Sequence, residues 1–245
     1  MKLLCLDIGN TSIAICDYKN EKLGEITRVA SDENFINQLT KYNLGSFDFI
    51  ILCSVVPNLT KLLINYCKNH SINIYEINYK NSHLNLHVDN PSEVGNDRIC
   101  NAIAAKKLNF NPSIIIDFGT ATTYDVINND GDFIGGAIAP GIDVSADYLI
   151  NKTALLKDTI YKFPPKVIGK NTISNIQSGV MYGGLASVEG MIKLIDAERG
   201  DVSNNIIITG GFGKLISKKI NSKHTYIESL TIEGMLQVFF KNQKY

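Results

Sequence analysis

The stretch "IIIDFGTATTYDV", residues 114–126, joins an apolar strand to an acidic turn that contains a glycine. Its isoleucines are β-branched and apolar without interruption, as in a strand covered on both faces. A carboxylate at the end of such a strand, here Asp117, is costly to bury unless it has a partner or a task. Gly119 lets the backbone turn tightly or approach a ligand closely. The threonines that follow supply hydroxyl and N–H groups that suit phosphate oxygens and an accompanying cation.

A second copy of this pattern lies at the start of the chain. Residues 3–15 read "LLCLDIGNTSIAI", in which an apolar strand again ends at an aspartate, Asp7, before Gly9 and small polar residues. The two aspartates are 110 residues apart, whereas solenoid repeats span roughly 20 to 50 residues. The repeat therefore predicts two similar halves that face each other, each with a phosphate-binding turn after its first strand. The alternative for either copy alone is a plain Asp-Gly turn between two strands.

The composition narrows the class of protein. The 245 residues are 44% hydrophobic and 20% charged, which is typical of a globular protein with a sizeable core. A net charge of zero argues against nucleic acid as the main partner. Five cysteines without a CxxC pattern read as apolar residues of a reducing cytoplasm, and the four histidines form no metal motif. No apolar run approaches about 18 residues, so neither a membrane span nor a signal peptide is expected.

Strand and helix signals alternate along the chain and predict an α/β fold. In the first half we expect strands within 1–18, 22–30, 47–57 and 72–78, and helices at 33–44 and 58–70, the latter capped by Asn58. In the second half we expect strands at 113–117, 122–128, 132–138 and 204–210, and a helix at 142–156. Residues 172–198 are expected to form either one long helix or two helices interrupted near Gly183 and Gly184. "NFNP" near residue 110 marks the boundary, which gives domains 1–110 and 111–245.

Two further motifs carry functional side chains. The stretch "NPSEVGNDRICNAIAAKKL", residues 90–108, reads as a helix with Asp97 and Arg98 near its start. An aspartate can accept a proton from a substrate hydroxyl, and an arginine can hold a carboxylate or a phosphate; the alternative is a solvated helix face. "TGG" at 209–211 would let backbone lie flat against a ring or a phosphate, although strand-end glycines are common in α/β proteins. The chain has no GxxxxGK[ST], no GxGxxG after its first strand and no GxSxG.

Taken together, the motifs resemble the superfamily of acetate and sugar kinases, heat-shock chaperone ATPases and actin. Within it the chain is similar to the type III pantothenate kinases. That resemblance rests on "DIGNT" (7–11), "NPSEVGNDR" (90–98), "DFGTATTYD" (117–125), "GGAIAPG" (135–141), "GKNTISNIQSG" (169–179) and "TGG" (209–211). It implies two ribonuclease-H-like or actin-like ATPase domains with mixed sheets flanked by helices, facing across a cleft.

The resemblance also implies an activity. Members of this family phosphorylate pantothenate with ATP to 4′-phosphopantothenate, the first step of coenzyme A biosynthesis, and form homodimers. Asp97 would be the general base, within a substrate-binding set of Gly95, Asn96, Asp97, Arg98 and Thr172. ATP would be bound by Asp7, Ile8, Gly9, Asn10, Thr11, Ser12, Ile13, Ala14, Thr120, Gly210 and Gly211. Asp7 would lie near Mg²⁺, and Asp117 would bind the monovalent cation, K⁺ or NH₄⁺, that the family requires.

Two positions depart from the family pattern. Val88 stands where many members have a tyrosine that lines the substrate pocket, which could loosen that pocket. Asn96 stands where many members have alanine, and we expect little effect from it. The competing interpretations are another kinase of the superfamily, a regulatory protein with a transcriptional accessory role that keeps the fold without turnover, and an actin-like filament protein. The intact phosphate turns and Asp97 argue against the regulatory protein, and the short chain argues against the other two.

Overall fold

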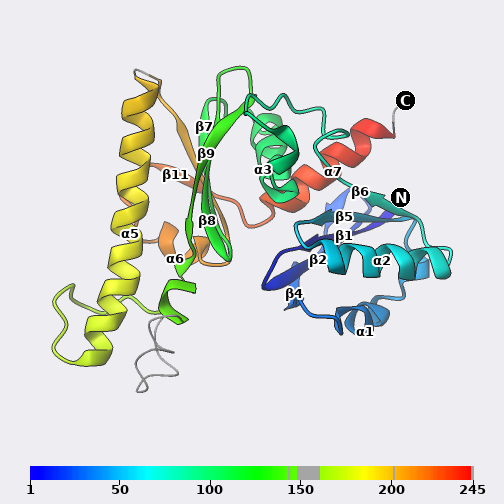
Figure 1. The fold of residues 1–245 in the computed structure, drawn as a ribbon, viewed down its shortest axis with the longest axis horizontal. Helices are drawn as coiled ribbons and strands as arrows, with labels where there is room; N and C mark the ends of the chain where they lie inside the picture. Colours follow the sequence, from blue (N-terminus) through cyan, green and yellow to red (C-terminus); the bar gives the residue numbers. More distant parts are fainter. Residues whose placement is uncertain (143, 148–160, 201, 244–245) are drawn as a thin grey trace. The chain divides into compact units, whose positions relative to one another are not determined.

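A computed structural model describes residues 1–142, 144–147, 161–200 and 202–243 (Figure 1). Contacts gather the chain into two compact units. The first unit comprises 1–111, 127–135 and 229–245, and the second comprises 112–126 and 136–228. The division into domains 1–110 and 111–245 stays a prediction. The compact units differ from this division because residues 127–135 and the C-terminal residues 229–245 pack with the first unit.

The first unit contains a mixed sheet in the order β3-β2-β1-β5-β6, with β4 also paired to β2. The strands are β1 (Lys2–Ile8), β2 (Ser12–Lys19), β3 (Lys22–Leu23), β4 (Thr27–Ala30), β5 (Phe49–Ser54) and β6 (Ile74–Glu76). β1 is antiparallel to β2 and parallel to β5, so it lies in the middle of the sheet. The central strands are apolar on both faces, as the uninterrupted apolar runs predict.

Helices cover the two faces of this sheet. The helices of the unit are α1 (Phe35–Leu39), η1 (Thr40–Tyr42), η2 (Leu44–Ser46), α2 (Pro57–Asn69), η3 (Pro91–Glu93), α3 (Asn96–Lys107) and α7 (Leu230–Asn242). Leu4, Leu6 and Ile8 of β1 pack with α1 and α2. Because side chains alternate along a strand, Leu3 and Cys5 point to the opposite face, which α3 and α7 cover. The same alternation puts Asp7 on the α3 side of the sheet.

The second unit repeats this plan. Its sheet has the order β11-β10-β7-β8-β9, formed by β7 (Ser113–Phe118), β8 (Ala121–Ile127), β9 (Phe133–Pro140), β10 (Asn205–Gly210) and β11 (His224–Tyr226). β7 is central like β1, its hairpin neighbours lie on one side, and the parallel strands β10 and β11 lie on the other. The expected duplication around two Asp-x-Gly turns is therefore confirmed at the level of sheet topology.

The second unit is covered by α5 (Thr172–Arg199) and α6 (Gly213–Ser217). Ile114, Ile116 and Phe118 of β7 form a core with Met181 and Leu185 of α5. Figure 1 shows α5 running in one piece alongside the sheet. Of the two alternatives for 172–198, the structure has one long helix without a break at Gly183 and Gly184, because buried side chains on both sides of the glycines hold the helix against the sheet.

Other local expectations also change. The helix expected at 33–44 is only α1 followed by two 3₁₀ turns, and the strand expected at 22–30 is divided into β3 and β4. Asn58 is not the cap of α2: Pro57 opens that helix and Val56 precedes it, in keeping with the preference of proline for the first helical position. Of the helix expected at 142–156, residues 143 and 148–156 lie outside the described residues. Over the described part of the chain, no helix has the length and apolarity needed to cross a membrane.

Candidate active site

In the first unit the candidate phosphate turn joins β1 to β2. The Gly9 N–H donates to the Ser12 carbonyl (3.1 Å), and Ser31 fixes the turn by donating its hydroxyl to the Gly9 carbonyl (2.6 Å). Asn10 and Thr11 lie exposed at its tip. The turn therefore presents backbone and hydroxyl groups to solvent, as a phosphate-binding turn must.

Three residues of the expected ATP-binding set lie deeper than the sequence suggests. Ile8 and Ile13 are fully buried and paired across β1 and β2, and Ala14 is buried opposite Asp7. Their side chains belong to the core of the first unit. Ile8 and Ile13 flank the turn 9–12, which is the exposed part of this expected set.

The second part of the site in this unit is the start of α3. Gly95 precedes the helix, and Asn96 opens it and donates its side-chain N–H to the Ser54 carbonyl (3.0 Å) at the end of β5. Ser54 lies beside Ile8 in the parallel register of β1 and β5. This hydrogen bond ties the start of α3 to the edge of the sheet where Asp7 also lies.

Asp97 is in the first turn of α3, and its carboxylate folds back over the helix start. Its Oδ1 accepts the Arg98 N–H at 2.8 Å. A side chain at Gly95 would begin 2.5 Å from that oxygen, so only glycine leaves room for it. Burial raises the pKa of Asp97 above the usual 3.8, although the Arg98 N–H and guanidinium act in the opposite direction. A carboxylate with a raised pKa is better matched to accepting a proton near neutral pH.

Asp7 and Asp97 share one neighbour, the buried thiol of Cys53. Cys53 lies opposite Asp7 in the sheet. A hydrogen bond with Cys100 and burial raise the pKa of the Cys53 thiol, and the Asp7 and Asp97 charges raise it further. Two carboxylates 90 residues apart in sequence are thus gathered at one edge of one sheet.

The second unit has the equivalent acidic turn between β7 and β8. Asp117 lies beside Thr209 of β10 in the parallel register, and the Gly119 N–H donates to the Ala121 carbonyl (3.1 Å). Gly210 has φ +84°, and a side chain there would begin 2.4 Å from Asp117 Oδ1. Gly210 therefore has to be glycine for the carboxylate to lie where it does.

The sequence-predicted residues of this unit form two groups. Asp117, Thr120, Gly210 and Gly211 lie around the ends of β7 and β10. The carboxylate, the hydroxyl and the backbone carbonyls there are oxygen ligands, which hard cations such as K⁺ and Mg²⁺ prefer. Thr172 is not among them, because it is the first residue of α5 and lies at the far end of a groove.

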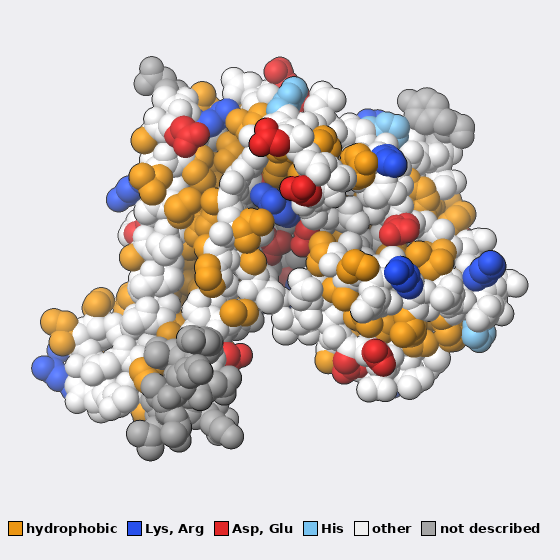
Figure 2. Space-filling view, viewed as in Figure 1, with side chains coloured by type: hydrophobic (Ala, Val, Ile, Leu, Met, Phe, Trp, Pro, Cys, Tyr) orange, Lys and Arg blue, Asp and Glu red, His pale blue; other side chains and the backbone are white. Residues whose placement is uncertain are grey.

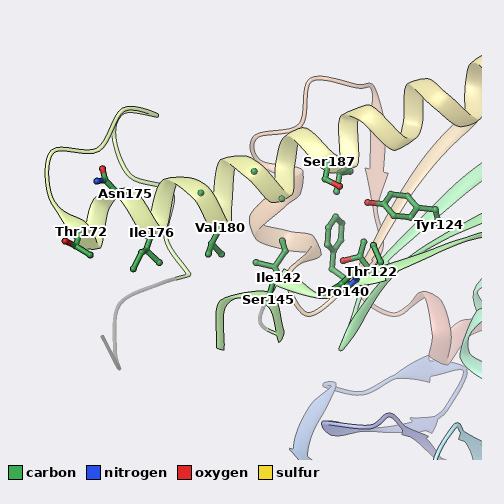
Figure 3. Close-up of a pocket in the computed structure, with 16 residues that line it drawn as sticks. Thr122, Tyr124, Pro140, Ile142, Ser145, Thr172, Asn175, Ile176, Val180 and Ser187 are labelled. Carbon is green, nitrogen blue, oxygen red and sulfur yellow. The ribbon is translucent and has the colours of Figure 1, made fainter. Parts of the chain in front are cut away.

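This groove has a volume of about 620 Å³ and is lined by residues of α5, by the sheet and by Pro140, Ile142 and Ser145. Figure 3 shows Ile176 and Val180 of α5 pointing toward Ile142 and Ser145, with Thr172 and Asn175 at the helix start. At the other end the Tyr124 hydroxyl hydrogen-bonds the Ser187 side chain. Gly179 and Gly183 line the groove, and nothing lies within 4 Å of where their side chains would begin.

Sequence reasoning did not single out several residues that shape the site. Ser54 anchors Asn96 through its carbonyl, which no side-chain pattern reveals. Cys53 and Cys100 were interpreted only as apolar residues, and all five cysteines are indeed free and buried. Among the described residues, no three His, Cys, Asp or Glu side chains could hold a metal ion together.

Comparisons with known proteins identify the family of the chain. The sequence model of a family described as type III pantothenate kinase matches residues 3–194. A type III pantothenate kinase of Moorella thermoacetica is 37% identical over 254 aligned residues, covering 98% of this chain and 99% of that protein.

Two solved structures show the same fold at low sequence identity. A candidate Baf family transcriptional activator from Campylobacter jejuni superposes with a TM-score of 0.66, 18% identity and coverage of 99% and 100% of the two chains. The archaeal actin homolog Ta0583 superposes with a TM-score of 0.51, 12% identity and coverage of 98% and 100%. At these identities the likeness speaks for the actin-like ATPase fold alone.

Proposed function

The chain belongs to the type III pantothenate kinase family and phosphorylates pantothenate with ATP in coenzyme A biosynthesis, and we propose how its residues do so. The observation that carries the proposal is the position of Asp97. It lies at the start of α3, tied to the strand end beside Asp7, with a pKa raised by burial. A purely regulatory role is not favoured, because the matching family and the relative at 37% identity are both named as kinases.

In the proposed reaction Asp97 accepts the proton of the pantothenate hydroxymethyl group. The hydroxyl oxygen then forms a bond to the γ-phosphorus of ATP, the bond from that phosphorus to the bridging oxygen breaks, and ADP leaves. Gly95, which has no side chain, leaves room for the Asp97 carboxylate, and Arg98 offers its guanidinium to anionic oxygens of the substrate. Thr172 is proposed as a further pantothenate contact.

The ATP phosphates are proposed to bind the turn 9–12, Thr120 and the Gly210–Gly211 backbone. Phosphoryl transfer needs mainly positioning and neutralised charge, which such turns supply. Mg²⁺, when bound, neutralises phosphate charge and needs only one or two protein carboxylates, for which Asp7 fits. The reducing cytoplasm is the proposed location, in keeping with five free cysteines.

The decisive assay couples ADP release to pantothenate addition, with MgATP and either K⁺ or Na⁺. We expect turnover that depends on pantothenate and is faster in K⁺. Turnover without pantothenate, or with a different hydroxyl acceptor only, would contradict the proposed substrate.

The monovalent cation is proposed to bind Asp117. Asp117→Asn removes a full negative charge from an oxygen-rich strand end, so we expect the K⁺ concentration for half-maximal activity to rise at least about tenfold. Kinetic titration with K⁺ measures this, with Asp130→Asn, an exposed carboxylate on a β turn, as the matched control. An unchanged K⁺ response in Asp117→Asn would place the cation elsewhere.

A homodimer is proposed through the groove beside α5. Gly179 and Gly183, one helical turn apart, leave open space on the face of α5 that lines the groove, which permits close approach of another chain at these two positions. Ile176 and Val180 line the same groove, and α5 also exposes Ile173 and Leu194 (42% and 65%). Figure 2 shows hydrophobic side chains gathered beside the long helix of this unit. A second copy of this chain is the occupant we propose.

Gly183→Leu tests the dimer. The new side chain meets open space within one chain and favours the helix, so the fold should be retained. It would fill the groove, and light scattering during gel filtration should then report one chain of 27.0 kDa in place of two. Ala197→Leu, at an exposed position near the end of α5, is the control. A wild-type monomer, or a Gly183→Leu dimer of unchanged affinity, would contradict this interface.

A further inference from the structure

Arg98 occupies a position where a helix does not favour a positive charge. It lies in the first turn of α3, at the positive end of the helix dipole. Its guanidinium carbon lies 5.3 Å from the centre of the Phe133 ring. The Phe133 side chain is 1% exposed, so the ring is fixed by its surroundings. An aromatic face attracts a cation at this distance, and more strongly where water is excluded.

The segment before Phe133 is an ordered turn between β8 and β9. The Asn128 side-chain oxygen accepts the N–H groups of Asp130 (3.0 Å) and Asp132 (2.8 Å). The Asn128 N–H also donates to the Asp132 carbonyl (2.9 Å), and Gly131 adopts φ +77°. These bonds fix the point at which β9 begins, and therefore fix the Phe133 ring.

The same turn also contacts residues 85–87, which precede the proposed substrate-binding residues at the start of α3. The His87 N–H donates to the Phe133 carbonyl (2.9 Å), and the Phe133 N–H donates to the Asn85 carbonyl (3.0 Å). Asp132 accepts hydrogen bonds from Asn85 Nδ2 (3.1 Å) and His87 Nε2 (3.2 Å). Lys106 of α3 lies 3.5 Å from Asp132 Oδ1. Asp132 and Phe133 thus contact the chain just before residue 88, and Asp132 also contacts α3 at Lys106.

We propose that Phe133 is a positioning residue for substrate binding: its ring holds the Arg98 guanidinium ready for the anionic end of pantothenate. This inference rests on the proposed role of Arg98. An arginine side chain has many rotamers, and ordering it when the substrate binds weakens affinity. A ring that orders it beforehand removes part of that loss. The effect should therefore appear in the KM for pantothenate more than in kcat.

The test compares four single variants, one of them Arg98→Gln, and one double variant. Phe133→Leu keeps an apolar side chain and removes the aromatic face, whereas Phe133→Tyr keeps the face. Phe239→Leu removes another fully buried ring of the same unit, whose ring neighbours are Phe49, Tyr75 and Phe240. Should Phe133→Leu not fold, Phe133→Met replaces it. The double variant combines Phe133→Leu with Arg98→Gln.

We expect Phe133→Leu to raise the KM for pantothenate about tenfold, with the KM for ATP nearly unchanged. Phe133→Tyr should keep the wild-type KM for pantothenate. Phe239→Leu should lower the melting temperature without changing the KM for pantothenate or for ATP. In the Arg98→Gln background, Phe133→Leu should have no further effect on the KM, because the two residues act as one unit.

The outcomes separate this inference from the proposed role of Arg98. If Arg98→Gln leaves the pantothenate KM unchanged, the role of Arg98 is wrong and the inference falls with it. If Arg98→Gln raises the KM but Phe133→Leu does not, only the positioning role is overturned. The positioning role is also overturned if Phe133→Leu raises the KM for pantothenate by the same factor in the Arg98→Gln background as in the wild type.

Discussion

Asp97→Asn is expected to lower kcat for pantothenate phosphorylation by about 10² to 10⁴. The amide occupies the volume of the carboxylate and can still accept the Arg98 N–H, but it cannot take a proton from the substrate hydroxyl. The ADP-release assay measures the loss. Asp89→Asn, at an exposed carboxylate eight residues earlier in the chain, is the matched control and should keep wild-type turnover. Asp97→Asn turnover within about tenfold of wild type would show that another group is the base.

The pH profile gives an independent test of the same residue. Burial raises the pKa of Asp97 above 3.8, so acidification protonates this carboxylate at a higher pH than an ordinary aspartate. Because the base must be ionised, kcat/KM should fall as the pH drops through that raised pKa and level off above it. The residual activity of Asp97→Asn should lack this acid limb. An acid limb at an ordinary aspartate pKa would contradict the role of burial.

Asp97→Asn, which is expected to lower activity, should not lower the stability of the protein at neutral pH. A carboxyl group whose pKa is raised in the folded state makes its full contribution to the free energy of unfolding below the unfolded-state pKa. That contribution is lost as the pH rises through the folded-state pKa. Asp97→Asn carries no charge and escapes this loss. Its melting temperature at neutral pH should equal or exceed that of wild type, and the difference should shrink below about pH 4. A strongly destabilised variant would mean that lost activity reflects misfolding.

Local patterns in the sequence carry much of the fold and of the phosphate turns. The run ending at Asp7 and the run ending at Asp117 are contiguous, so each predicts its own strand and turn. The matching topology of the two sheets follows from their repetition. The order of glycine and carboxylate around Asp97 is equally local, and Gly95 lies where a side chain would meet that carboxylate.

The features that the sequence did not predict depend on contacts between residues far apart in the chain. Gly183 and Gly184 suggest a helix break, but packing against the sheet keeps α5 continuous. Asn96 looked like a change of little effect, yet it bonds a carbonyl 42 residues earlier. Phe133 lies in an ordinary hairpin, and only the folded chain puts its ring against Arg98. No local pattern encodes such pairings.

The close crossing of α3 and α7 depends on one glycine. Gly234 of α7 lies against Cys100 of α3, and a side chain at 234 would begin 1.9 Å from the Cys100 carbonyl oxygen. It would also lie 2.5 Å from the carbonyl carbon. Because these are backbone atoms, no rotamer change relieves the clash, and the two helices have to separate.

Gly234→Ala is therefore expected to destabilise the protein by at least about 3 kcal/mol, in spite of the better helix propensity of alanine. For a chain of this size, that lowers the melting temperature by about 6 to 12 °C. Gly190→Ala is the matched control, because it makes the same change inside α5 where nothing lies within 4 Å. It should leave the melting temperature unchanged or slightly higher. A Gly234→Ala variant as stable as Gly190→Ala would contradict the close crossing.

The clash should also reach the active site, because α3 carries Asp97 at its first turn. Below its lowered melting temperature, Gly234→Ala should have a reduced kcat as the start of α3 shifts against Ser54. A displacement of about 1 Å of a catalytic group is enough to cost roughly 10²-fold in rate. Gly190→Ala, in the other unit, should keep wild-type kcat. Normal turnover in a destabilised Gly234→Ala would mean that the hydrogen bond between Asn96 and Ser54 holds Asp97 independently of α7.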